Sequence, residues 1–216
     1  MKLTSASMGI GTAAGIATGV STPAAIKLSW IPLGAGQRIV KLSGTAFEAI
    51  SAVLQRRTPC DIYHAALVIT VPEGRYTIEM TPIPYHHGET RGVVAEGPVG
   101  MKWLGRFRIF RYEIRRWSGG VIPDLNEAVS TATISADAAC AHRLLELLPT
   151  VPVLVWGRDE LHAGDMWNSN SVIAWLLTRG HIDTDQIAFP IGGRAPGWSA
   201  GLVVAKRQLN EALTVR

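Results

Sequence analysis

Cysteines, charged residues and aromatic residues are all scarce in this chain. Its 216 residues include two cysteines, Cys60 and Cys140. Two cysteines exclude a disulfide-rich scaffold, and their spacing provides no Cys-x-x-Cys pair for a metal. No run of 18 apolar residues occurs, so the sequence predicts no membrane-spanning helix. Charged residues make up 18% and the formal net charge is +4, too small an excess to indicate nucleic-acid binding.

The hydrophobic fraction of 47% excludes a disordered chain, because it supplies enough apolar surface to offset the entropy of folding. Positive charge is nevertheless concentrated in one stretch. Residues 102–116 hold six basic side chains against Glu113 alone. Two interpretations remain open for this stretch, which we expect to be a strand. It is the solvated face of a sheet, or it binds phosphate or lipid headgroups and gives peripheral contact with a membrane.

Small and aliphatic residues dominate the amino-terminal segment. We expect residues 1–30 to be a flexible or loosely packed leader, followed by one domain over residues 31–216. The alternative for residues 1–26 is a cleaved secretory signal, with Lys2 before an apolar stretch that four glycines interrupt. The first interpretation favours a cytoplasmic protein, and the second a secreted or cell-envelope protein. The glycines at 9, 11 and 15 do not indicate a dinucleotide site, because no buried strand precedes them.

Hydrophobic periodicity predicts the secondary structure. A period near 3.6 favours helices, and alternation or short apolar runs favour strands. The expected helices are residues 44–54, 137–148 and about 171–178, and the expected strands are residues 62–71, 75–80, 93–94, 106–117 and 201–205. The three residues between the first two of these strands predict an antiparallel hairpin. The alternation in 106–117 changes phase between Ile109 and Phe110, which predicts a β-bulge. Together these elements predict one α+β domain, an antiparallel sheet packed on helices.

Three polar positions on these elements suggest chemistry. His64 lies near the start of the first strand of the hairpin, Glu79 lies on the second, and Asn168-Ser169-Asn170-Ser171 precedes an apolar helix. A histidine held by a carboxylate can move a proton, and a helix amino terminus stabilises an oxyanion. The plain alternatives are a structural histidine, a glutamate that is solvated or paired with Arg75 or with an arginine in 106–116, and a set of helix caps.

These motifs resemble the circularly permuted papain-like superfamily, the NlpC-type branch typified by lecithin:retinol acyltransferase. The resemblance rests on His64-Ala-Ala-Leu at the start of a hairpin and on Asn168-Ser169-x-x-Val172 at the start of a helix, and it covers roughly residues 60–180. The Asn-Ser-Asn-Ser motif also resembles a bacterial family of unknown function near this group. The resemblance implies a papain-like fold with His64 as the proton shuttle, Glu79 as its orienting residue and Ser169 as the nucleophile.

The family uses cysteine where this chain has Ser169, and serine needs a general base to remove its proton during attack. Cys60 and Cys140 do not occupy the nucleophile's position. The resemblance therefore leaves two functions open. One is a hydrolase or acyltransferase that cleaves an amide or ester without a cofactor. The other is a catalytically inactive domain that binds a peptide, glycan or lipid.

Several neighbouring residues complete the expected site. The backbone N–H of Ser169 is the first oxyanion donor, and the residues expected to assist it or to contact substrate are Asn168, Asn170, Trp167 and Tyr63. Residues 156–165 would form a pocket wall or a charged loop, and Arg194 and Trp198 lie in a loop rich in glycine and proline. His86, His87 and Glu89 could bind a metal together with Glu79 or His64, but adjacent histidines in a loop point in different directions, so we predict no metal site. A third class of function, an interaction protein acting through residues 102–116, also remains open.

Overall fold

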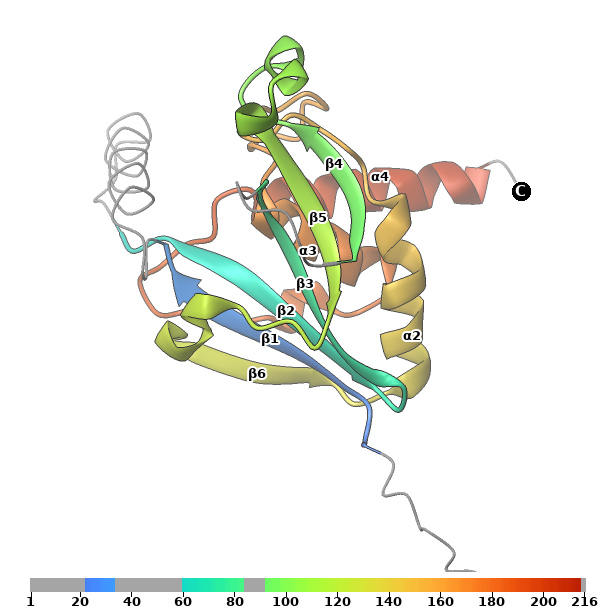
Figure 1. Ribbon diagram of the computed structural model, residues 1–216. Helices are drawn as coiled ribbons and strands as arrows, with labels where there is room; N and C mark the ends of the chain where they lie inside the picture. Colours follow the sequence, from blue (N-terminus) through green and yellow to red (C-terminus); the bar gives the residue numbers. More distant parts are fainter. Residues whose placement is uncertain (1–21, 34–59, 84–91, 215–216) are drawn as a thin grey trace, which may run out of the picture.

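The computed structural model describes residues 22–33, 60–83 and 92–214 (Figure 1). This part of the chain forms an α+β fold, in which three α-helices pack against a six-stranded antiparallel sheet of order β4-β5-β3-β2-β1-β6. The strands are β1 (Ala25–Pro32), β2 (Tyr63–Val71), β3 (Gly74–Pro82), β4 (Val93–Pro98), β5 (Arg111–Ser118) and β6 (Ser130–Ser135). The helices are α2 (Ala138–Leu147), α3 (Ser169–Arg179) and α4 (Trp198–Thr214).

The predicted hairpin is confirmed as β2 and β3. Pairing runs from Val71 opposite Gly74 to Leu67 opposite Ile78. Gly74 has a φ of +157°, a conformation that costs glycine little and suits the tight turn. Odd-numbered residues of β2 and even-numbered residues of β3 point towards the helices, and their apolar side chains belong to the main core cluster.

The two central helix predictions are also confirmed. Asp137 caps α2 by accepting hydrogen bonds from the backbone N–H groups of Ala139 and Cys140. The apolar residues with helical spacing, Ala141, Leu144, Leu145 and Leu148, are buried, as is Cys140. Helix α3 begins at Ser169, two residues before the predicted start, and ends at Gly180. Its residues from Asn170 to Thr178 are all buried, so α3 is the central helix of the core.

The predicted strand over residues 201–205 is wrong, because these residues form the second turn of α4. A short apolar run fits a strand or a buried helical segment equally well, and here the buried residues Gly201, Val204 and Ala205 follow a helical spacing. Gly201 allows α4 to approach α3 closely. A Cβ atom on Gly201 would lie 2.2 Å from the carbonyl oxygen of Ser171.

The strand predicted over residues 106–117 is correct only in its second half. Residues before Arg111 form two short 3-10 helices, η1 (Lys102–Arg106) and η2 (Arg108–Phe110), and β5 begins at Arg111. The change of phase at Ile109 and Phe110 therefore marks the end of η2, and the expected β-bulge is not there. The basic stretch 102–116 is accordingly a pair of 3-10 turns followed by a strand.

The amino-terminal boundary also needs correction. Residues 25–30, assigned from sequence to a leader, belong to β1, which lies between β2 and β6 and pairs with both. The short strand expected at Val93 and Val94 is present as the start of β4. The predicted helix over residues 44–54 and the histidines 86 and 87 lie outside the described residues, as do residues 1–21.

Candidate active site at the divergence of β2 and β3

Strands β2 and β3 pair along only part of their length. Beyond the pair formed by Leu67 and Ile78, residues 63–66 continue alongside β1 and residues 79–82 continue alongside β5. Figure 1 shows the two strands separating towards these ends. We call the opening between residues 63–66 and 79–82 the β2–β3 fork. Residues 63–66 of β2 therefore do not pair with β3, whereas residues 67–71 do.

Asn170 of α3 takes the place of β3 as the partner of this part of β2. Its Oδ1 accepts a hydrogen bond from the Ala65 N–H at 2.7 Å, and its Nδ2 donates to the Tyr63 carbonyl oxygen at 3.0 Å. The side chain is 3% exposed, so these bonds satisfy groups that would be costly to leave buried and unpaired. The side-chain amide has the donor and acceptor of a peptide group, and it fixes the amino terminus of α3 at the fork.

Asn168 and Ser171 build the cap of the same helix. Asn168 Oδ1 accepts from the backbone N–H groups of Asn170 and Ser171, and Ser171 Oγ accepts from the Asn168 N–H. The capping interpretation of these two residues is therefore confirmed. Asn170 is also engaged, through its hydrogen bonds to β2. Three of the four polar side chains in the motif therefore hold the local structure.

Ser169 is the remaining member of the motif. It is the first residue of α3 and is partly exposed. The first N–H groups of a helix have no partner within it, and the Asn168 cap takes those of Asn170 and Ser171. Ser169 precedes Asn170 and His64 precedes Ala65, so the 2.7 Å bond between Asn170 and Ala65 joins the two segments that carry the expected nucleophile and base.

His64 and Glu79 lie on the same face of the sheet. His64 is directly opposite Ile31, which packs with Ala66 and Ile122 in a small cluster separate from the main core. The neighbours of Glu79, Ile78 and Met80, belong to the main core, so alternation turns Glu79 to the face away from the helices. Ser169 is on α3, on the side of the sheet where the helices pack. The fork lies between Ser169 and the face that carries His64 and Glu79.

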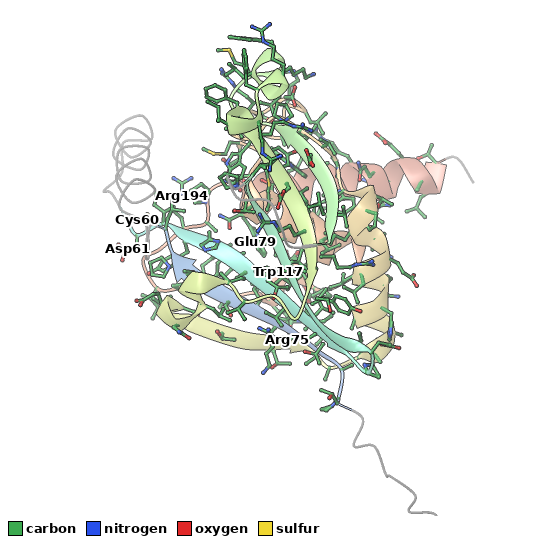
Figure 2. All side chains as sticks on the ribbon, in the orientation of Figure 1. Cys60, Asp61, Arg75, Glu79, Trp117 and Arg194 are labelled. Carbon is green, nitrogen blue, oxygen red and sulfur yellow. The ribbon has the colours of Figure 1, made fainter. Side chains whose placement is uncertain are left out.

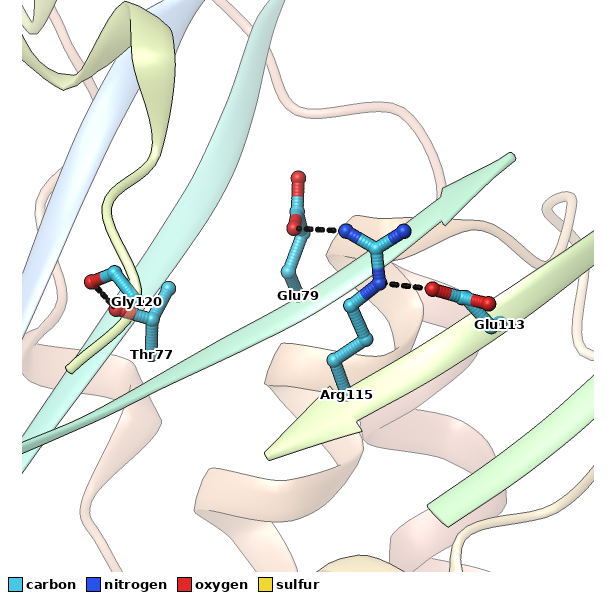
Figure 3. A network of polar contacts seen from close by, with 5 residues as sticks. All are labelled: Thr77, Glu79, Glu113, Arg115 and Gly120. Carbon is cyan, nitrogen blue, oxygen red and sulfur yellow. Dashed lines mark hydrogen bonds and ion pairs between the residues drawn. The ribbon is translucent and has the colours of Figure 1, made fainter. Parts of the chain in front are cut away.

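Glu79 forms an ion pair with Arg115 of β5, its direct cross-strand neighbour. Arg115 Nη1 is 3.3 Å from Glu79 Oε2, while its Nε donates to Glu113 Oε1 (Figure 3). Arg115 and Glu113 are both buried. The sequence-based alternative of a salt bridge to an arginine within 106–116 is thus confirmed. The guanidinium fixes the position of the Glu79 carboxylate on β3.

Tyr63 and Trp167, expected to contact substrate, are both buried in the main core. A Cβ on Gly193 would lie 2.1 Å from the ring of Tyr63, so the chain passes directly over this ring. Burial, and then the nearby Asp61, raises the pKa of the Tyr63 phenol. The indole N–H of Trp167 is buried and has no hydrogen-bond partner among the described residues.

The segment before α4 is a part of the site that sequence reasoning left undecided. Its Pro196 carbonyl oxygen accepts from Nδ2 of both Asn168 and Asn170. The Arg194 carbonyl oxygen accepts from the Tyr63 N–H at 2.8 Å, and the Arg194 backbone N–H donates to the Asp61 carbonyl oxygen at 3.0 Å. Figure 2 shows Arg194 beside Cys60 and Asp61 at the start of β2. The three glycines and one proline of residues 192–197 were the only sequence signal for this close approach.

Residues 156–165, expected to form a pocket wall or a charged loop, border a small hollow against α4. Its lining residues are Leu154, Arg158, Asp159, Glu160, Leu161, Ala163, Asp165, Trp167, Ala200 and Val204. His64, Glu79 and Ser169 do not line it. Within the described residues, no cluster of three or more His, Cys, Asp or Glu side chains could bind a metal ion. No helix in the same ranges is long and apolar enough to cross a bilayer.

Comparisons with known proteins give no relative for this chain. No protein-family model, no curated protein and no solved structure matches it.

Proposed function

We propose that this chain is a papain-like domain that cleaves or transfers an acyl group at an amide or ester, with Ser169 as the nucleophile and His64 as the proton shuttle. The observation that supports this most is the clamp between Asn170 and β2. It holds the amino terminus of α3 against β2, whose second residue is His64, at a point where the sheet is open. A nucleophile at a helix start beside a strand histidine is the arrangement that acyl transfer requires.

The proposed reaction has two steps. In the first, Ser169 Oγ attacks the carbonyl carbon while His64 takes the hydroxyl proton. The backbone N–H of Ser169 donates to the oxyanion, and His64 then protonates the leaving amine or alkoxide, which leaves an acyl-serine. In the second, water or an acceptor alcohol or amine gives a proton to His64 and attacks the ester. Collapse of this second oxyanion returns the proton to Ser169 and releases the product.

Glu79 is the orienting residue in this proposal. It shares a sheet face with His64, and Arg115 holds its Oε2 in place. A fixed carboxylate beside an imidazole selects the tautomer that can accept the serine proton, and it stabilises the imidazolium that forms. Arg115 is therefore a positioning residue that acts through Glu79.

A fluorophosphonate probe tests the proposal without knowledge of the substrate. The wild-type protein is expected to acquire one adduct, which peptide mass spectrometry places on Ser169. Ser169→Ala should abolish labelling, and His64→Gln should slow it by about two orders of magnitude or more. Ser130→Ala removes an exposed serine of β6 and serves as the matched control, with unchanged labelling. Circular dichroism confirms that each variant is folded.

A second candidate function is a papain-like binding domain without catalysis. Two observations favour it: three of the four polar residues in the α3 motif are used by the fold, and alternation sets His64 on the face of the sheet away from the helices. An intact protein that the probe does not label, and that binds a peptide, glycan or lipid equally well as wild type and as Ser169→Ala, would establish this function instead.

A further inference from the structure

A knob of apolar and basic side chains projects from the sheet between β4 and β5. We call residues 101–110 the η1–η2 projection, and Figure 1 shows it at the top of the molecule, beyond the ends of both strands. Trp103 is 57% exposed and Ile109 is 59% exposed. Met101, Phe107 and Phe110 are exposed as well. So many large apolar side chains on one short segment mark an interaction surface.

Positive charge is interleaved with these apolar side chains. The projection contains Lys102, Arg106 and Arg108 and no acidic residue, although Lys102 pairs with Glu160 of a neighbouring segment at 2.9 Å. The guanidinium of Arg106 lies over the rings of both Trp103 and Phe107, at 5.2 and 4.6 Å from their centroids. Arginine retains its charge in such a stack. The surface therefore offers cations and aromatic rings side by side.

The projection is built on ordered backbone contacts. The Val99 N–H donates to the Phe110 carbonyl oxygen at 2.8 Å and closes its base. The Gly100 N–H donates to the Trp156 carbonyl oxygen, and Arg158 Nε donates back to the Gly100 carbonyl oxygen at 2.7 Å. The backbone that carries the exposed side chains is thus held by a fixed support, so binding does not require a loop to become ordered.

We propose that the η1–η2 projection is a membrane-docking element that inserts Trp103, Phe107 and Ile109 into the interfacial region of an anionic bilayer. Three observations favour a bilayer over a protein partner. The surface is convex, and a bilayer deforms around a knob whereas a protein would need a matching groove. Tryptophan and phenylalanine partition favourably into the membrane interface. Arg106 and Arg108 match the negative charge of anionic headgroups.

Co-sedimentation of the full chain with vesicles tests this proposal, and it does not depend on the proposed catalysis. The vesicles are phosphatidylcholine alone or with about one third phosphatidylglycerol. We expect binding to the anionic vesicles that weakens as salt is raised. Trp103→Ser with Ile109→Ser should lower the partition coefficient at least about tenfold. Arg106→Gln with Arg108→Gln should lower it about fivefold per charge, and only on anionic vesicles.

Matched controls lie elsewhere on the surface. Ile191→Ser removes a fully exposed apolar side chain, and Lys27→Gln with Lys206→Gln removes two exposed charges. Both control variants should retain the binding to anionic vesicles that the projection provides. Trp103→Phe tests insertion directly, because it keeps an aromatic side chain in the projection. If Trp103 inserts, brominated lipids should quench less of the tryptophan fluorescence in this variant than in the wild-type protein.

Two results would overturn the proposal. One is a wild-type protein that stays in the supernatant with anionic vesicles at low salt. The other is a loss of binding that is as large in the control variants as in the projection variants. If vesicles do not bind and sedimentation velocity shows self-association that Trp103→Ser with Ile109→Ser abolishes, the surface is a protein interface instead.

Discussion

Arg115 illustrates how single residues shape this site. Its guanidinium is buried between the carboxylates of Glu79 and Glu113. Moving a charge out of water costs several kcal/mol, and nearby opposite charges offset that cost. Removing the arginine would leave two carboxylates close together on adjacent strands, one of them buried. Arg116, the next residue, is exposed and provides a natural comparison.

We predict that Arg115→Met lowers the free energy of unfolding by about 3 kcal/mol, the cost of breaking a buried ion pair from one side. Urea denaturation measures it. Arg116→Met should change the same quantity by less than about 0.5 kcal/mol, as exposed substitutions do. Equal effects of the two substitutions would show that the ion pairs of Arg115 do not stabilise the fold.

His142 couples α2 to the hairpin turn in a pH-dependent way. Its Nδ1 is 2.8 Å from the Ala138 carbonyl oxygen, and its Nε2 is 3.1 Å from Glu73 Oε2. The hydrogen bond to Ala138, and then the one to Glu73, raises the pKa of His142 above its ordinary value. The Glu73 backbone N–H, and then His142, lowers the pKa of Glu73. A raised histidine pKa favours the folded state at low pH, and this contribution is lost as pH rises through the raised value.

We therefore predict that Glu73→Gln lowers the pKa of His142 but leaves it above the ordinary value, because the Ala138 carbonyl remains. A titration followed by NMR measures the shift. Glu146→Gln, which removes only a minor charge influence, should lower the pKa less. A pKa of His142 that does not respond to Glu73→Gln would show that the two side chains are not in contact in solution.

At the scale of elements, the close contact of α3 and α4 fixes the floor of the site. Gly201 lies against the Ser171 carbonyl oxygen and the Ala174 side chain, within the first turns of the helix that begins at Ser169. Ser171 Oγ also donates to the Gly197 carbonyl oxygen at 2.7 Å. The loop before α4 and the start of α3 are thus one packed unit.

Gly201→Ala separates packing from helix propensity. In an open helix the change would stabilise by about 1 kcal/mol. Here the added methyl group would meet backbone, so we predict a loss of about 1–3 kcal/mol, measured by chemical denaturation. Asn210→Ala on the exposed side of α4 should be neutral or slightly stabilising. A more stable Gly201→Ala protein would contradict the close packing of these helices.

Local sequence signals predicted the elements whose periodicity is strong. The hairpin and helix α2 are examples, because a turn of fixed length and a clear apolar stripe each specify one structure. The run Gly201–Ala205 was too short to separate strand from helix. Strand β1 was missed although Ile26, Leu28 and Trp30 alternate with Lys27 and Ser29, which is typical of a strand. The small residues before it led to its assignment to the leader, and its place in the sheet comes from strands distant in the sequence.

At the scale of the whole molecule, the site depends on contacts that no local pattern contains. Ala65 and Asn170 are 105 positions apart, and Asn170 and Pro196 are 26 apart. The sequence indicated which residue types mattered at the start of α3. It did not indicate that Asn170 would complete the edge of β2, or that the loop before α4 would join both. The fork results from β2 and β3 following different neighbours.

The most direct test of the account is the reactivity of a thiol in place of Ser169. A helix amino terminus and a nearby histidine stabilise a thiolate. We therefore predict that Ser169→Cys is alkylated by iodoacetamide at pH 7 on the order of tenfold faster than Ser130→Cys, an exposed reference, with peptide mapping to separate the native cysteines. Adding His64→Gln should remove most of the difference. A Ser169→Cys thiol that reacts no faster than the reference, with or without His64, would contradict an activated nucleophile at the β2–β3 fork.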